Sequence, residues 1–160
     1  AVKGALPTVL GWLFIGSSAP AFTDNRLGAY IGAFCVILGH VFPVFLKFKG
    51  GKGIASSIGV CIVLQPVVIA ITFLCAFVFL YFTHLGSLAS FMAISVPIAF
   101  EGFSVASTDS PEAAAGAILL FALFALTVFA HRKNVLRLFT GTESRTVLRK
   151  KKNSELKQDK

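Results

Sequence analysis

Uncharged apolar runs make up most of this sequence and limit the folds that it can adopt. Five runs without Asp, Glu, Lys or Arg cover residues 4–22, 27–46, 53–82, 87–100 and 113–130. A helix needs about 20 apolar residues to cross the ~30 Å hydrocarbon layer of a membrane. With a mean hydropathy of +0.81 and only 14% charged residues, the chain does not have the composition of a soluble domain. We therefore expect an all-α fold, a polytopic integral membrane helical bundle.

The run from 53 to 82 is too long for one ordinary membrane span. Gln65-Pro66 lies in its middle, and a proline ends or kinks a helix at the residue before it. Lysine-rich loops lie on the cytoplasmic side. The lysines of 47–52 and the basic C-terminus lie on the same side only if this run forms two helices rather than one. The first of them, residues 53–64, rises about 18 Å and is too short to span the membrane alone.

The resulting topology has six transmembrane or half-transmembrane helices. Lys3, the glycine loop, the turn at 84–90 and the segment 131–143 lie on the cytoplasmic face of a membrane domain formed by residues 1–143. Residues 131–160 carry +7 of the net charge of +8. We expect 144–160 to be a basic cytoplasmic tail that lies on anionic lipid headgroups rather than on nucleic acid. Charged residues of the outer loops are interpreted as solvated: Asp24, Arg26, Glu101, Asp109 and Glu112.

A segment rich in glycine and lysine joins the second and third runs. It reads Lys47-Phe48-Lys49-Gly50-Gly51-Lys52-Gly53. Glycines let consecutive backbone N–H groups turn toward one point without side-chain clash, and the ammonium groups add positive charge. This pattern favours a phosphate site at the membrane surface. A basic loop that only fixes the topology is an equally open alternative.

A second polar cluster follows the last apolar run. If the last helix continues through it, His131, Asn134 and Arg137 recur at i, i+3 and i+6 and lie near one face. An imidazole, an amide and a guanidinium on one face can bind phosphate oxygens from several directions. For Arg132 and Lys133 we favour side chains that only extend to the lipid headgroups.

The remaining polar residues have two open interpretations each. His40 either orients the glycine loop through a backbone carbonyl or is a hydrogen-bonded core histidine. Ser87 and Ser90 either cap the next helix or add hydroxyl donors to a phosphate site. The cysteines lie in apolar runs without the spacing of a metal site, and we interpret them as core residues: Cys35, Cys61 and Cys75. We expect neither a metal nor a cofactor.

No nucleophile is accompanied by a base in this sequence. An enzyme built from these parts would bind phosphate groups and position two substrates, without a covalent intermediate. In their order, the motifs resemble the bacterial acyl-phosphate:glycerol-3-phosphate acyltransferase family. The similarity runs through residues 3–7, 39–46, 48–56, 87–90, 131–138 and 141–143.

The resemblance implies a reaction and roles for individual residues. The family transfers a fatty acyl group from acyl phosphate to glycerol 3-phosphate at the inner membrane and so makes lysophosphatidic acid and inorganic phosphate. Lys52, His131 and Asn134 would act in catalysis. Substrate phosphate would be bound by Gly50, Gly51, Gly53, Ser56, Ser87, Ser90, Arg137 and Lys3. His40 and Glu143 would support the site. With no protein base evident, we expect a substrate phosphate, whose second pKa is near 6, to accept the hydroxyl proton.

One part of the family pattern is missing before Lys3. Family members resemble one another in an earlier helix and in a loop rich in Ser, Gly, Asn and Thr, so they have seven helices where we expect six. We therefore expect either a truncated chain or a degenerate member. Two other functions remain open. One is a small membrane transporter of an anion or phosphate ester, because transporters also place half-length helices beside glycine loops. The other is a non-catalytic membrane subunit whose basic tail recruits a partner.

Overall fold

The computed structural model describes residues 1–18, 26–44, 47, 50–109 and 111–140. In this part of the chain the regular secondary structure is helical: α1 (Val2–Ser18), α2 (Arg26–Val41), α3 (Ile54–Leu64), α4 (Pro66–Thr83), α5 (Gly86–Ala106), α6 (Pro111–Ala130) and α7 (Arg132–Phe139). The all-α membrane bundle is thus confirmed. These residues form seven helices rather than six because the last apolar helix ends at Ala130 and a separate short helix follows it.

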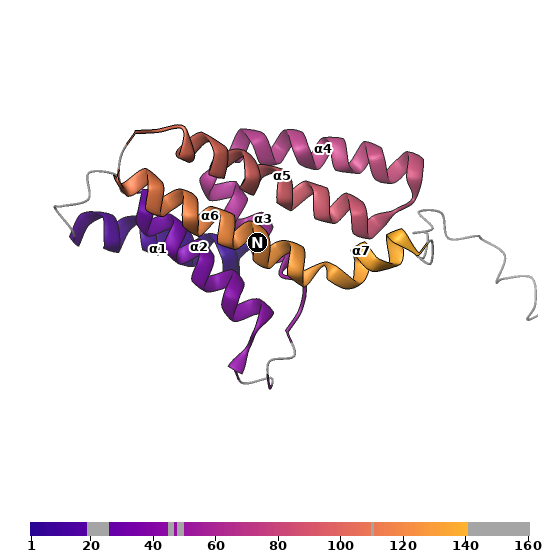
Figure 1. Cartoon of the computed structure of the whole chain (residues 1–160), viewed down its shortest axis with the longest axis horizontal. Coiled ribbons are helices and arrows are strands. Elements are labelled where there is room, and N and C mark those ends of the chain that lie inside the picture. The colour runs from indigo at the N-terminus through magenta and orange to yellow at the C-terminus, as the bar shows by residue number, and fades with distance from the viewer. Residues whose placement is uncertain (19–25, 45–46, 48–49, 110, 141–160) are drawn as a thin grey trace, which may run out of the picture.

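Three of the described helices are long and apolar enough to cross a membrane by length and composition. They are α4, α5 and residues Ala113–Ala130 of α6. Figure 1 shows α4, α5 and α6 extending along the long axis of the molecule, and α5 packs against both of the others. Only 11% of α4 is buried inside the chain, so most of its surface is available to lipid.

The long third run is divided at the predicted place. α3 ends at Leu64, Gln65 leaves the helical conformation with φ −142°, and Pro66 begins α4. α3 has 11 residues and α4 has 18. α3 is therefore about 10 Å shorter than α4 and is too short to cross the hydrocarbon layer alone.

Glycines allow α1 and α2 to touch through their backbones. A methyl group at Gly11 of α1 would collide with the carbonyl of Gly28 in α2, and one at Gly32 would collide with the carbonyl of Pro7. Small residues at such crossings are typical of membrane helices, which gain packing energy from close backbone contact. α1 also packs against α3, where Gly4 lies against the backbone of Ser56.

The core of the bundle joins α2, α3, α5 and α6. Its buried members include Ala33, Ile37, Val60, Cys61, Ile98 and Leu123. The core interpretation is right for Cys61 and wrong for Cys35 and Cys75, which are exposed. An apolar run does not distinguish a residue that faces the core from one that faces lipid, because both environments are apolar.

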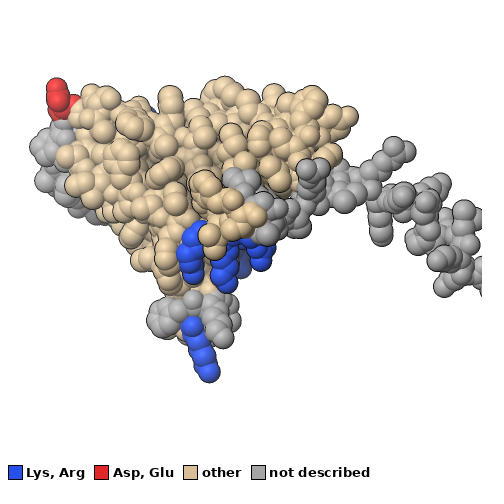
Figure 2. All heavy atoms as spheres, turned by 45° about the vertical axis from the view of Figure 1, so that its right-hand side comes forward, with Lys and Arg blue, Asp and Glu red and all other residues tan. Residues whose placement is uncertain are grey.

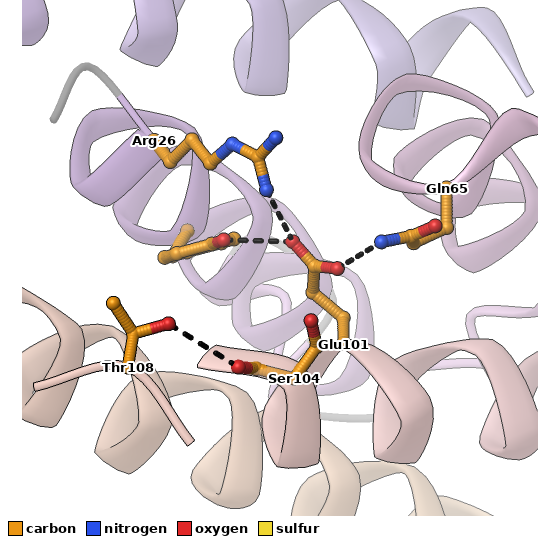
Figure 3. Close-up of polar contacts among 6 residues, drawn as sticks. Arg26, Gln65, Glu101, Ser104 and Thr108 are labelled. Carbon is orange, nitrogen blue, oxygen red and sulfur yellow. Dashed lines mark hydrogen bonds and ion pairs between the residues drawn. The ribbon is translucent and has the colours of Figure 1, made fainter. Parts of the chain in front are cut away.

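Glu101 corrects the prediction for the outer loops. α5 continues past it to Ala106, and the Glu101 side chain is only 1% exposed. Tyr30 donates a hydrogen bond of 2.7 Å to Oε1, and Gln65 donates one to Oε2 through Nε2. Nη1 of Arg26 lies 3.8 Å from Oε1 (Figure 3). Arg26 balances the negative charge, and Tyr30 and Gln65 satisfy the carboxylate oxygens. The carboxylate is therefore buried between helices and is not solvated.

Most basic side chains lie in one region of the molecule. In Figure 2 most of the visible Lys and Arg side chains gather there, and the acidic side chains visible on that face lie away from it. Arg26, which pairs with Glu101 at the start of α2, is outside this region. We call the end that contains Gly50–Gly53 the glycine-loop end. α7 and the N-terminus of α1 lie at the same end, since Lys52 acts electrostatically on His131 and Gly4 touches Ser56.

Candidate functional site

The glycine loop leads from α2 into α3. Gly53 precedes the first residue of α3, is buried, and has φ +75°, a left-handed conformation that glycine adopts without strain. Its carbonyl accepts a hydrogen bond of 2.8 Å from the N–H of Ser57. A methyl group at Gly50 would collide with the carbonyls of His40 and Val41. Gly50 and Gly53 are therefore required by the path of the backbone.

His40 lies against this loop. Its Nδ1 is 3.3 Å from Oγ of Ser56, and a Cβ at Gly51 would lie 3.1 Å from Nε2. His40 thus connects the loop to a serine hydroxyl on α3. Both interpretations of His40 from the sequence stay predictions, because a hydrogen-bonded histidine beside the loop fits either.

His131 and Asn134 lie together at the junction between α6 and α7. His131 is fully buried, and its Nδ1 is 2.9 Å from the carbonyl oxygen of Thr127. A carbonyl only accepts, so Nδ1 carries the proton and Nε2 is left as an acceptor. In the described part of the chain, Nε2 of His131 and Nδ2 of Asn134 are buried without a hydrogen-bond partner. One unpaired acceptor and one unpaired donor thus stand three residues apart.

The electrostatics of the site keep His131 neutral. Burial lowers the pKa of His131, and the positive charge of Lys52 lowers it further, against the opposing effect of the Thr127 carbonyl. A neutral imidazole is the form that can accept a hydrogen bond at Nε2. The same interaction brings the charge of the glycine loop close to the α6–α7 junction, although the two are far apart in the sequence.

A hollow of about 530 Å³ opens between the glycine loop and the start of α7. It is lined by Val41, Phe42, Gly50, Gly51, Lys52, Phe129, Ala130, Arg132 and Lys133. Three of these residues are cationic, and none is acidic. Such a set attracts anions, and phosphate in particular, because two glycines, Gly50 and Gly51, lie beside the cations in the wall of the hollow.

The sequence profile described as glycerol-3-phosphate acyltransferase matches residues 1–141 of the chain, including the glycine loop and the α6–α7 junction. The chain belongs to the glycerol-3-phosphate acyltransferase family. The glycerol-3-phosphate acyltransferase of Burkholderia pseudomallei (strain K96243) is 33% identical over 154 residues, which cover 93% of this chain and 74% of that protein. The one of Paraburkholderia xenovorans (strain LB400) is 36% identical over 157 residues, covering 98% and 69%.

Solved structures of glycerol-3-phosphate acyltransferases share the fold. PlsY (YgiH), an integral membrane glycerol 3-phosphate acyltransferase, has been crystallised in a lysophosphatidic acid form and in a glycerol 3-phosphate form. The first superimposes with a TM-score of 0.67 and 28% identity over 90% of this chain and 67% of that chain. The second gives 0.64 and 27% identity, over 89% and 68%.

The structure places other expected site residues differently from the prediction made from the sequence. His131 separates α6 from α7, and Asn134 and Arg137 lie three residues apart within α7. Asn134 is buried like His131, whereas Arg137 is exposed and is not among the residues that line the hollow. Ser87 and Ser90 lie within α5 after its N-cap residue, Leu85, and Ser90 donates a hydrogen bond of 3.0 Å to the Ser87 carbonyl. They are therefore not caps.

The N-terminal and C-terminal members of the expected set have less to connect them to the site. Lys3 is exposed on the first turn of α1, one residue before the contact between Gly4 and Ser56. Glu143 and the expected tail at 144–160 lie outside the described residues.

Three residues of the site were missed or misinterpreted from the sequence. Arg132 and Lys133 were expected to reach only toward lipid headgroups, but they line the hollow with Lys52. Ser57 was not considered. It is 1% exposed, and in the described part of the chain its hydroxyl has no hydrogen-bond partner. Its position in the sequence, immediately after Ser56 and four residues beyond Gly53, could have indicated a second hydroxyl near the glycine loop.

Proposed function

We propose that this chain acts as an acyltransferase that uses acyl phosphate as donor and glycerol 3-phosphate as acceptor. The products are lysophosphatidic acid and inorganic phosphate, in phospholipid synthesis. The observation that carries the proposal is a buried His131 that feels the charge of Lys52 and whose Nε2, like Nδ2 of the buried Asn134, has no hydrogen-bond partner in the described part of the chain. Membership of the glycerol-3-phosphate acyltransferase family supports the acceptor.

The hollow beside the glycine loop suits the phosphate groups of both substrates. Lys52, Arg132 and Lys133 supply positive charge, and Gly50 and Gly51 expose backbone N–H groups at its wall. Binding two phosphates at one rim brings the acceptor hydroxyl and the acyl carbonyl together, and this proximity accounts for much of the rate of such a reaction. The acyl chain of the donor extends from this rim toward the apolar bundle.

His131 and Asn134 orient the acceptor. The glycerol hydroxyl that does not react donates a hydrogen bond to Nε2 of His131, whose tautomer is set by Thr127. Nδ2 of Asn134 donates to a phosphate or glycerol oxygen. Binding the substrate in this way satisfies two buried polar atoms that have no partner within the described chain, so the substrate removes the cost of leaving them unpaired.

The transfer needs no covalent enzyme intermediate. The glycerol oxygen forms a bond to the acyl carbon, the bond from that carbon to the phosphate oxygen breaks, and inorganic phosphate leaves. The hydroxyl proton moves to the departing phosphate, while Lys52 compensates the negative charge that develops. We place the site on the cytoplasmic side of the bacterial inner membrane, because basic loops remain on that side.

Phosphate release from the purified full chain tests this proposal. The chain in detergent is mixed with acyl phosphate and glycerol 3-phosphate, and inorganic phosphate and lysophosphatidic acid are measured. We expect equal amounts of both products, and a rate about 100-fold lower for Lys52→Ala. Uptake of glycerol 3-phosphate into proteoliposomes without phosphate release would instead support a transporter. If the chain showed neither phosphate release nor uptake, a non-catalytic subunit would be the remaining interpretation.

Two basic residues of α7 offer a matched comparison. Lys133 lines the hollow, whereas Arg137 is exposed on the next turn. In discs of zwitterionic lipid we expect Lys133→Ala to raise the KM for glycerol 3-phosphate by about tenfold, with little change for Arg137→Ala. Equal effects of the two substitutions would contradict the assignment of the hollow as the phosphate site.

A further inference from the structure

α7 carries apolar and basic side chains on a surface that points away from the bundle. Leu136 is 64% exposed and Phe139 is 84% exposed, and Arg137 is exposed between them. We call these three residues the outer surface of α7. Asn134 is buried on the side of the same helix that lies away from Leu136 and Phe139. This eight-residue helix exposes two large apolar side chains, holds three cations and has no acidic residue in its range. Such a surface requires a partner that is both apolar and anionic.

The helical geometry separates the apolar and basic parts of this surface. With 3.6 residues per turn, Leu136 and Phe139 share one face, and Lys133 and Arg137 share the neighbouring one. Arg132 is held back at the start of the helix, because its guanidinium lies 4.0 Å from the centre of the Phe129 ring and donates a hydrogen bond of 2.9 Å to the Phe129 carbonyl. The exposed basic face is thus distinct from the apolar one.

Connectivity places α7 at the surface of the bilayer. α6 is a candidate membrane span up to Ala130, and α7 begins two residues later. Short helices with an apolar face and a basic face lie in the interface plane, with the apolar side chains about 5–10 Å into the boundary between headgroups and acyl chains. Basic residues at that depth attract anionic lipids more than zwitterionic ones.

We propose that the outer surface of α7 binds the anionic lipid headgroups of the adjoining leaflet. Leu136 and Phe139 enter the boundary between headgroups and acyl chains, and Arg137 contacts the lipid phosphates. Lys133, one turn before Arg137, stands between this lipid surface and the hollow.

This lipid contact also affects the site. His131 comes directly before α7, and Asn134 belongs to it. Among the described helices, α7 packs mainly against α5 and α6. An anchored outer surface holds Asn134 toward the bundle. The charge of the membrane therefore influences how well the site is formed, and this consequence rests on the proposed function.

Fluorescence quenching by brominated lipids tests the binding without any assay of activity. The chain has a single tryptophan, Trp12, so a Trp12→Phe/Phe139→Trp protein reports only on position 139. In nanodiscs that mix phosphatidylcholine and phosphatidylglycerol, we expect brominated phosphatidylglycerol to quench this indole more strongly than brominated phosphatidylcholine at equal content. Adding Arg137→Gln removes that preference and keeps the quenching.

A matched control comes from α4. Phe82 is 76% exposed near the end of that helix, and Trp12→Phe/Phe82→Trp is expected to show equal quenching by the two brominated lipids. Equal quenching at position 139 would overturn the proposal. So would an indole at 139 that only the water-soluble quencher acrylamide reaches, because that surface then faces water or another protein.

Phosphate release in the same nanodiscs tests the consequence for the site. We expect a rate about fivefold higher with phosphatidylglycerol present than with phosphatidylcholine alone. Leu136→Ser/Phe139→Ser is expected to remove the gain, because the helix then no longer enters the boundary between headgroups and acyl chains. A gain that survives this double substitution contradicts the proposal. A chain that quenches as expected but releases no phosphate in any disc contradicts the proposed function and leaves the lipid contact standing.

Discussion

Gln65 and Glu101 are joined by a hydrogen bond from Nε2 of the glutamine to Oε2 of the glutamate, across 36 residues of sequence. Gln65 is the residue at which α3 gives way to α4, and Glu101 belongs to α5. The bond therefore attaches the break in the third apolar run to a full-length helix. Since the other end of α3 carries Gly53, this attachment also limits how far the glycine loop can shift along the bundle.

Removing the Glu101 carboxylate is expected to destabilise the bundle. Glu101→Ala leaves the Tyr30 hydroxyl and the Gln65 amide without an acceptor, and we expect the free energy of unfolding to fall by about 2–4 kcal/mol. Thermal unfolding in detergent measures this effect. Asp109→Ala serves as the control, because Asp109 is exposed near the end of α5. If both variants unfold at the wild-type temperature, Glu101 is not a structural link.

Gly53 is expected to be intolerant of a side chain. Its φ of +75° is strained for alanine, so Gly53→Ala should lower the free energy of unfolding by about 1–2 kcal/mol and displace the N–H groups of the loop. Gly39→Ala is the matched control, since a Cβ at Gly39 meets nothing within 4 Å. We expect no loss of stability for Gly39→Ala. Equal unfolding temperatures for the two variants would mean that the loop adapts freely.

The pKa of His131 should respond to Lys52. Burial and the Lys52 charge both lower this pKa, so Lys52→Gln is expected to raise it toward its ordinary value of about 6.5. Titration of the imidazole carbon signals by NMR measures the shift, and Lys47→Gln is the control for a lysine of the same segment. No shift in Lys52→Gln would place the two residues too far apart for a shared site.

The same pKa gives the pH dependence a definite sign. A histidine whose pKa is lower in the folded chain than in the unfolded one favours the folded chain while it is neutral. Its contribution to stability is therefore complete above pH of about 6.5 and is lost as the pH falls through the folded pKa. Acid is expected to destabilise wild type more than His131→Gln, which thermal unfolding at several pH values checks. Equal acid sensitivity in both proteins would contradict a lowered pKa.

Ser57 is expected to contribute to substrate binding and not to folding. Its hydroxyl is buried without a partner in the described part of the chain, so Ser57→Ala removes an unsatisfied group and should leave the unfolding temperature equal or higher. Under the proposed function, the KM for one of the phosphate substrates should rise by about tenfold. Ser107→Ala at the far end of α5 is the control. A KM equal to that of wild type would show that the hydroxyl is not used.

The tertiary structure decided which polar residues meet. Glu101 ends an apolar run in the sequence and was expected to be solvated, but Tyr30 and Gln65 reach it from other helices and allow its burial. Arg137 was expected to act with Asn134, but of these two residues of α7 only Asn134 is buried against the bundle, and Arg137 is exposed. Whether Arg132 and Lys133 face lipid or a hollow depends on the position of α2 and its loop, which local spacing does not contain.

The amino-acid sequence alone determined the membrane class, the helical fold, the break at Gln65-Pro66 and the glycine loop as a candidate site. Each of these follows from local properties: the length of uncharged runs, the missing N–H of proline, and the backbone freedom of glycine. Only the packed structure decided that Lys52 lies near His131 and that Ser57 is buried without a partner. These relationships depend on how the helices cross, because contacts between residues far apart in the chain are created only when the bundle closes.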